Sequence, residues 1–148
     1  TPRFNNHPIP PDDVVPSGDT LKETTMSVFS KTAAEGVRTE LHDKLGLTGA
    51  EVSVNNLPAN AAVPFVHKHT KNEELYGVLA GSGELYIDGE VVGIKAGDWF
   101  RIAPEGRRAI RAAAESSVTF ICVQTKAGSL EGFTMTDGVP CEEKAPWH

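Results

Sequence analysis

Two histidines separated by one residue, with two glutamates a few positions later, are the residues whose types and spacing best suit chemistry. They are His67, His69, Glu73 and Glu74. In an extended strand, residues two apart point to the same face, so both imidazoles can offer a nitrogen to one ion. A carboxylate from the returning chain then completes a triad of two histidines and one carboxylate. The spacing predicts a divalent metal site, for iron, manganese, nickel or zinc, with open positions for a substrate.

The alternation of side chains decides which glutamate is expected to bind. Glu74, Tyr76 and Val78 share one face of the returning segment, whereas Glu73 and Leu75 share the other. The first face carries the larger side chains that can line a pocket, so Glu74 is the expected ligand. Tyr76 shares this face and is a candidate catalytic residue, able to donate a proton or a hydrogen bond.

Short apolar segments separated by turn residues surround these candidates from about residue 21 to residue 126. Their regular spacing predicts an all-β barrel or sandwich. Asp88-Gly89 predicts a tight hairpin, because a type I′ turn needs positive φ at both central residues. Residues 63–69, which carry the histidines, are expected to form a strand. The one expected helix is residues 31–35, followed by Gly36.

The chain divides into three zones around a single domain of 148 residues. Residues 1–20 are rich in proline and are expected to form an extended arm. Residues 21–126 form the barrel, and residues 127–148 form a C-terminal tail expected to pack on it. The run 118–123 is apolar on both faces, so its outward face needs a cover, either the arm or a second subunit. A homodimer is therefore expected.

The spacing around the histidines resembles the first motif of the cupin family, H-x-H-x(3,4)-E-x(6)-G. His67, His69, Glu74 and Gly81 match it. This resemblance implies a jelly-roll β-barrel, here with an extended arm and a C-terminal tail, that holds a divalent metal inside. It covers roughly residues 50–124.

The second cupin motif is matched in part, at Gly97, Pro104 and Gly106. It ends in a histidine that is the family's fourth metal ligand. Aligned from Pro104, that position is Ala109; aligned from Gly97, it is Arg108. The fourth ligand is absent in both alignments, and Ala109 is the expected position.

The family resemblance leaves more than one function open, because cupins include dioxygenases, isomerases, lyases, decarboxylases, storage proteins and sugar-binding regulators. The first expectation is a metal-dependent oxygenase, or an isomerase or lyase, that acts on a small anionic or hydroxylated organic molecule. The alternative is a non-catalytic cupin that binds a small ligand for sensing or storage. Arg101, Arg108 and Gln124 are the expected substrate-binding residues.

Composition excludes several other classes of function. Lys and Arg number 14 against 20 Asp and Glu, and this net charge of −6 gives no general attraction for nucleic acid. No apolar run approaches the roughly 18 residues of a membrane helix. The first residues show no apolar signal segment, so a cytoplasmic protein is expected. Two cysteines without a CxxC spacing predict neither a disulfide framework nor a zinc–thiolate site.

Overall fold

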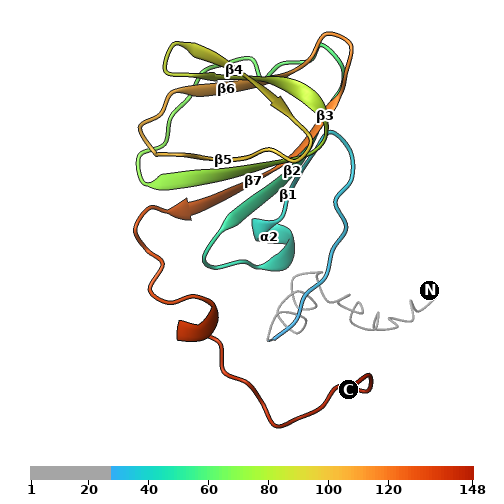
Figure 1. Ribbon diagram of the computed structural model, residues 1–148, viewed down its shortest axis with the longest axis vertical. Coiled ribbons are helices and arrows are strands. Elements are labelled where there is room, and N and C mark those ends of the chain that lie inside the picture. Colours follow the sequence, from blue (N-terminus) through green and yellow to red (C-terminus); the bar gives the residue numbers. More distant parts are fainter. Residues whose placement is uncertain (1–27) are drawn as a thin grey trace, which may run out of the picture. The chain divides into compact units, whose positions relative to one another are not determined.

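The computed structural model describes residues 28–148, and almost all of its regular structure is β (Figure 1). The expected N-terminal arm and the first residues expected in the barrel lie outside the described range. The strands are β1 (Arg38–Glu40), β2 (Glu51–Leu57), β3 (Asn72–Ile87), β4 (Glu90–Lys95), β5 (Trp99–Ile102), β6 (Arg108–Ala112) and β7 (Val118–Lys126). The two short helices in this part of the chain are α2 (His42–Leu45) and the 3₁₀-helix η1 (Thr134–Thr136).

The strands form two facing layers that are joined by the long strand β3 (Figure 1). In one layer the order is β1-β2-β7-β3, and β5 pairs with the other edge of β3. In the second layer, the C-terminal half of β3 pairs with β4 and β6. Every pairing is antiparallel. The predicted all-β, jelly-roll fold is confirmed.

A bend at Gly81 carries β3 from one layer to the other. The pairing of β3 with β7 shifts register between Val78 and Ala80, and Gly81 follows with φ 74°. A Cβ atom on Gly81 would lie 1.8 Å from the carbonyl oxygen of Ser117. Only glycine fits this combination of positive φ and close backbone approach, which explains the residue that ends the first motif.

The hairpin between β3 and β4 has the predicted turn. Asp88 and Gly89 have φ 46° and 92°, the two positive values that a type I′ turn requires. The Asp88 carboxylate also accepts a hydrogen bond from the Arg107 backbone N–H, with Oδ1 at 2.8 Å from the nitrogen. This bond ties the turn to the start of β6.

The predicted helix at residues 31–35 is wrong. These residues are not helical, and the helix lies later, at α2, where Gly46 ends it with φ 67°. The backbone N–H of Glu35 donates to Thr39 Oγ1, and that hydroxyl donates back to the Glu35 carbonyl. Together with Gly36, whose φ is 75°, these bonds hold the segment in a bend that leads into β1.

The predicted strand at residues 63–69 is also wrong. The segment touches β6 only at separate points, with Val63 N–H bonded to the Ile110 carbonyl and His67 bonded to Arg108 in both directions. Between these points the segment advances four residues, from Val63 to His67, while β6 advances only two, so residues 64–66 bulge out of the ladder. The histidines therefore lie on an irregular extended segment held against the barrel.

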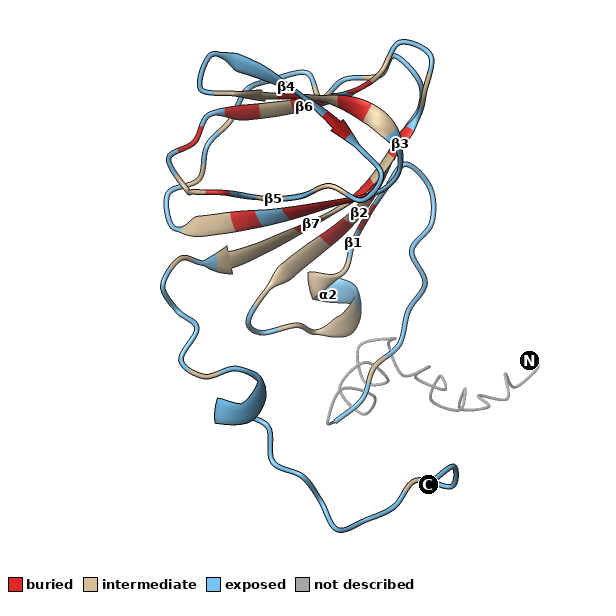
Figure 2. Cartoon of the chain, viewed as in Figure 1, coloured by how far each residue is buried: buried red, intermediate tan, exposed pale blue. Residues whose placement is uncertain are grey.

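The core lies between the two layers, where inward-facing side chains of both meet. Buried positions alternate with more exposed ones along β6, as Figure 2 shows, and along β3 except beside the bend, where Tyr76, Gly77 and Val78 are all buried. The buried apolar residues are Tyr76, Val78, Leu85, Ile94, Ile102, Ile110, Ala112, Val118, Phe120 and Cys122. Neither helix in residues 28–148 approaches the length and apolarity of a membrane span.

Candidate metal centre

His67, His69 and Glu74 come together between the layers. Each offers a ligand atom, and these atoms all lie within 4.8 Å of one another. The histidines come from the irregular segment before β3, and the glutamate comes from the start of β3. Glu74 is 2% exposed, whereas the neighbouring Glu73 points outward. The arrangement can hold one divalent ion with two imidazoles and one carboxylate.

Backbone hydrogen bonds hold the two histidines in place without a continuous strand. The His67 N–H donates to the Arg108 carbonyl at 3.0 Å, and the Arg108 N–H donates back at 2.9 Å. The His69 N–H donates to the Pro104 carbonyl at 2.8 Å. The two imidazoles stand nearly edge to face, with ring centres 5.3 Å apart. Each histidine is thus held by β6 or by the loop before it, and neither histidine lies in a regular strand.

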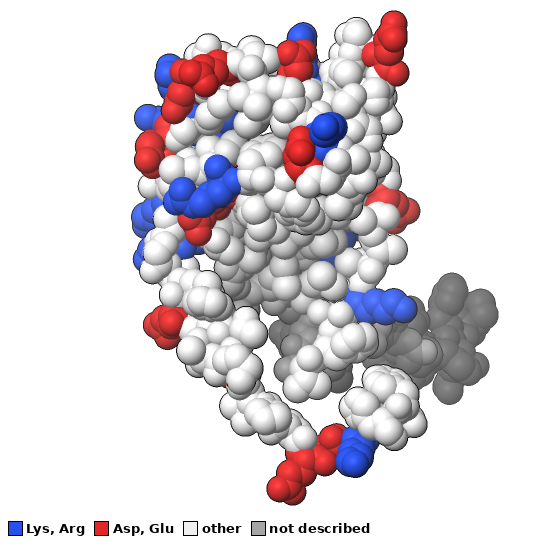
Figure 3. All heavy atoms as spheres, in the orientation of Figure 1, with Lys and Arg blue, Asp and Glu red and all other residues white. Residues whose placement is uncertain are grey.

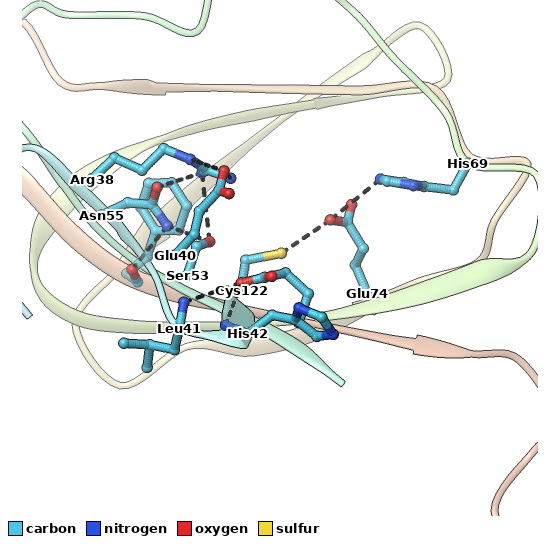
Figure 4. Close-up of polar contacts among 11 residues, drawn as sticks. Arg38, Glu40, Leu41, His42, Ser53, Asn55, His69, Glu74 and Cys122 are labelled. Atoms are coloured by element: carbon cyan, nitrogen blue, oxygen red, sulfur yellow. Dashed lines mark hydrogen bonds and ion pairs between the residues drawn. The ribbon is translucent and has the colours of Figure 1, made fainter. Parts of the chain in front are cut away.

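Glu74 is the centre of the polar contacts in the interior. The Tyr76 hydroxyl donates to Oε1 at 3.1 Å, and the Cys122 thiol donates to Oε2 at 3.0 Å. His69 Nε2 lies 3.4 Å from Oε2, and Figure 4 shows Cys122 and His69 on either side of the carboxylate. Arg108 Nη1 lies 3.3 Å from Oε1. Both carboxylate oxygens are therefore contacted by side chains from four parts of the chain: β3, β7, β6 and the segment before β3.

Burial keeps the two donors to Glu74 protonated. It raises the pKa of the Tyr76 hydroxyl, and the nearby Cys122 and Glu74 raise it further. It also raises the pKa of the Cys122 thiol, to which the hydrogen bond with Glu74 adds. Burial lowers the pKa of His67, an effect that Glu74 opposes and Arg108 and His69 reinforce. The site thus favours a neutral imidazole at His67, the form that can bind a metal.

The residues present fit a bound metal ion. His67 Nδ1 and His69 Nε2 are buried and have no hydrogen-bond partner in the part of the chain described here. A buried polar atom without a partner is costly, and a metal ion would satisfy such a nitrogen. The donor set of two imidazoles and a carboxylate suits iron, manganese, nickel or zinc.

Arg108 is the least exposed of the charged residues at the site. It is 1% exposed, and its Nη2 donates to the Ala103 carbonyl at 2.8 Å. Nε and Nη1 are buried and have no hydrogen-bond acceptor among residues 28–148, although Nη1 lies near Glu74. Ala109, the next residue, also borders the interior. Neither position supplies a fourth metal ligand.

A cavity of about 460 Å³ opens next to the three candidate ligands. Tyr76, Arg108, Ala109 and Gln124, all singled out from the sequence, line it. Much of its wall is apolar, formed by Val37, Leu57, Val63, Phe65, Ile110 and Phe120. This is the size and character of a site for a small organic molecule.

Arg101, the remaining candidate for substrate binding, does not border this cavity. It lines a separate hollow of about 720 Å³ beside β4 and β5, and its Nε donates to Glu73 Oε2 at 2.6 Å. On β5, Phe100 and Ile102 point inward, so the alternation turns Arg101 outward. Acidic and basic side chains lie next to one another at several places on the surface shown in Figure 3.

Sequence reasoning assigned no role to several residues that the structure brings to the cavity. Cys122 directly opposes Tyr76 across β3 and β7, and its thiol donates to Glu74. Arg38 also borders the cavity, with Nη1 bonded to Asn55 Oδ1 at 2.7 Å (Figure 4). The sequence signal for Cys122 is its position two residues before Gln124, which places both side chains on the same face of the strand. No motif marked Arg38.

Comparisons with known proteins agree with this architecture. The family model of the Cupin domain matches residues 54–124. The crystal structure of a cupin protein from Bacteroides fragilis is 59% identical, covers 76% of this chain and 96% of its own, and has a TM-score of 0.73. No curated protein matches the sequence.

Two more distant solved structures share the fold. A Cupin 2 conserved barrel domain protein from Salinispora arenicola is 19% identical, covers 61% of this chain and 75% of its own, and has a TM-score of 0.54. A sugar phosphate isomerase from the cupin superfamily of Silicibacter pomeroyi is 23% identical, covers 62% of this chain and 60% of its own, and has a TM-score of 0.53. At these identities the likeness concerns the fold alone.

Proposed function

This chain belongs to the cupin family, and from that premise we propose that it is a metal-dependent enzyme acting on a small organic molecule inside its barrel. One observation carries the proposal: three ligand atoms, from His67, His69 and Glu74, converge within 4.8 Å beside a cavity. The buried histidine nitrogens without hydrogen-bond partners among the described residues support it. The metal is iron, manganese, nickel or zinc.

A divalent ion at this site would act as a Lewis acid on a substrate oxygen or as a centre for oxygen chemistry. The protein's own contribution is to hold the ligands and shape the cavity. Tyr76 and Cys122 fix both oxygens of Glu74 by donating to them, which orients the carboxylate toward the histidines. Gln124, at the cavity wall, offers an amide to a polar group of the substrate.

The reaction classes that we propose are oxygenation, or isomerisation or elimination. All use a metal with open positions, and a site with three protein ligands leaves such positions free. Tyr76, whose hydroxyl stays protonated because burial raises its pKa, can serve as a hydrogen-bond donor near the metal.

Metal reconstitution tests the proposal. The full chain is stripped with a chelator, offered iron(II), manganese, nickel or zinc in turn, and assayed for bound metal by mass spectrometry. We expect one ion per chain, with most of it lost in His67→Ala and His69→Ala. His42→Ala is the matched control, because the His42 side chain is 45% exposed and its ring bonds Asp43 rather than any of the three candidate ligands. Wild-type protein that holds none of these ions would refute the proposal.

A second candidate function is a non-catalytic cupin that binds a small ligand for sensing or storage. It is favoured by Arg108, a buried cation at one of the two positions where the family has a fourth ligand. Oxygen uptake and substrate turnover by the reconstituted protein distinguish the two functions. A ligand that binds the metal-loaded protein unchanged, without turnover, would favour the binding function.

A further inference from the structure

Arg108 gives the cavity an anion-binding group that needs no metal. The residue is 1% exposed and borders the cavity, yet its Nε and Nη1 have no hydrogen-bond acceptor in residues 28–148. Only Nη2 is bonded, to the Ala103 carbonyl. Buried donors left without acceptors are costly, and an oxygen of a bound ligand would satisfy them.

The charge of the site favours an anionic ligand. The Arg108 guanidinium and the Glu74 carboxylate, 3.3 Å apart, cancel each other's charge. A divalent ion on the triad would leave two uncompensated positive charges in a largely apolar interior. A neutral histidine at the position of Arg108 would have left one. Buried charge is stable only when it is paired, so the arginine increases the preference for an anion.

Arg38, the other arginine on this cavity, is less available. Its side chain is 50% exposed, and Glu40 accepts hydrogen bonds from both Nε and Nη2. Asn55 accepts a bond from its Nη1. Most of the Arg38 donors are therefore occupied, two of them by the carboxylate of Glu40. Arg108 is the arginine with free donors.

The rest of the ligand must match an apolar wall. Leu57, Val63, Ile110 and Phe120 line the cavity, together with Phe65. Phe65 is 60% exposed although it lines the cavity, so it lies where the cavity meets solvent. Its ring packs edge to face on His67, with ring centres 5.7 Å apart. A ring or branched chain held by these side chains would place a polar end near the metal site.

We infer that the ligand of this site is a small carboxylate with an apolar body, whose carboxylate oxygen accepts hydrogen bonds from Arg108 Nε or Nη1. The inference deepens the proposed function by naming the substrate class. The inference rests on the proposed function only where the metal is concerned. The contact between the ligand carboxylate and Arg108 involves a protein side chain and can be measured without metal.

Calorimetric titration with three simple probes tests the inference on the full chain, both zinc-loaded and metal-free. Benzoate carries the ring and the charge, benzyl alcohol carries the ring alone, and acetate carries the charge alone. We expect benzoate to bind about tenfold or more tightly than either of the others, since a charge-assisted hydrogen bond is worth this much. Equal affinity for benzoate and benzyl alcohol would overturn the inference, and this comparison needs no variant.

Two arginines of β6 provide a matched pair of variants. Arg108→Gln should lose the preference for benzoate over benzyl alcohol. Arg111→Gln should keep it, because Arg111 is exposed and bonds Glu84 on the outside. Benzoate binding by Arg108→Gln at the wild-type affinity would overturn the inference. Phe65→Ala, which removes an apolar ring and no hydrogen-bonding group, should weaken benzoate binding and leave acetate binding unchanged; an effect on neither would exclude the apolar wall.

The metal-free titration keeps the two proposals separate. If the protein binds no metal but metal-free protein prefers benzoate through Arg108, the proposed metal chemistry fails and the carboxylate site stands. If metal binds and neither form prefers benzoate, the carboxylate site fails and the metal centre stands.

Discussion

At the scale of single residues, two adjacent glutamates have opposite surroundings. Glu74 is 2% exposed and accepts hydrogen bonds from Tyr76 and Cys122, whereas Glu73 is bonded by Arg101 outside the barrel. The side chains of neighbouring residues in a strand point to opposite faces, so one position separates a ligand from a surface ion pair. The pair provides its own control for a test of the metal site.

Glu74→Gln should lower metal affinity by at least about tenfold, because an amide oxygen carries no charge to offset that of the ion. Glu73→Gln should change it by no more than about twofold, since an exposed ion pair contributes little. Competition with a chromogenic chelator measures both affinities. A larger loss in Glu73→Gln than in Glu74→Gln would contradict the assignment of the ligand.

At the scale of the elements, the bend in β3 depends on one glycine. Gly81→Ala would place a Cβ atom 1.8 Å from the Ser117 carbonyl oxygen at a φ of 74°. We expect it to lower the free energy of unfolding by more than about 2 kcal/mol, because the strained φ and the clash add. Urea unfolding followed by circular dichroism measures the change.

Gly93→Ala is the control for this change. Gly93 lies within β4, has no positive φ, and would bring its Cβ within 4 Å of no atom. Alanine loses less conformational entropy on folding than glycine, so stability should stay the same or rise slightly. Equal destabilisation by the two substitutions would show that the bend tolerates a side chain.

The β3–β4 hairpin should lose stability in acid through Asp88. The hydrogen bond from the Arg107 backbone N–H lowers the pKa of this carboxyl below its ordinary value of 3.8. The unfolded chain therefore binds a proton at a higher pH than the folded chain does, and stability falls as the pH drops through and below 3.8. Asp88→Asn should flatten this part of the pH profile of the melting temperature.

Glu90→Gln is the control, because it also removes an exposed acidic side chain of this hairpin, but not the one that accepts a hydrogen bond from Arg107. Glu90 lies at the start of β4, one residue after the turn. If Asp88→Asn and wild type lose stability in parallel between pH 5 and the acid limit of folding, the hydrogen bond to Arg107 contributes nothing to the hairpin.

Local patterns predicted those elements whose signals lie within one segment. The turn at Asp88-Gly89 has the predicted position, because turn chemistry is local. By contrast, the motif that ends at Gly81 does not reveal that β3 continues through this glycine, which bends the chain without ending the strand. A glycine that terminates a strand and one that bends it look the same in a sequence.

The candidate site likewise has one part that the sequence predicts and another part that it does not. The proximity of two histidines and a glutamate follows from spacing along one stretch of chain. The contacts of Cys122 and Arg108 with Glu74 depend on which strands lie beside β3 and in which register. No short motif contains that information, so the contacts of Cys122 and Arg108 with Glu74 can be learned only from the fold.

At the scale of the whole molecule, the outer face of the larger layer is apolar. By register, Val54 on β2 lies beside Ile121 on β7, and Val123 lies beside Leu75 on β3. Leu75 is 42% exposed in the single chain. The C-terminal tail also exposes apolar side chains, namely Leu130, Phe133, Met135, Val139 and Trp147. Apolar surface of this kind commonly marks an interface.

We expect the protein to be a homodimer that covers this face. Light scattering coupled to gel filtration should give twice the chain mass. Leu75→Lys should shift it toward the monomer, because a charge in an apolar interface is costly. Val91→Lys is the control, since Val91 is also apolar and exposed but lies on β4 in the other layer. A monomeric wild type would contradict the expectation.

The single strand that belongs to both layers also governs how the molecule can come apart. β3 pairs with β5 and β7 through its first half and with β4 and β6 through its second half. Neither layer can separate from the other without breaking a ladder that contains this strand. The barrel should therefore open as one cooperative unit. Amide hydrogens in the middle of β3 should exchange with deuterium only through global unfolding, with the same free energy on both sides of the bend.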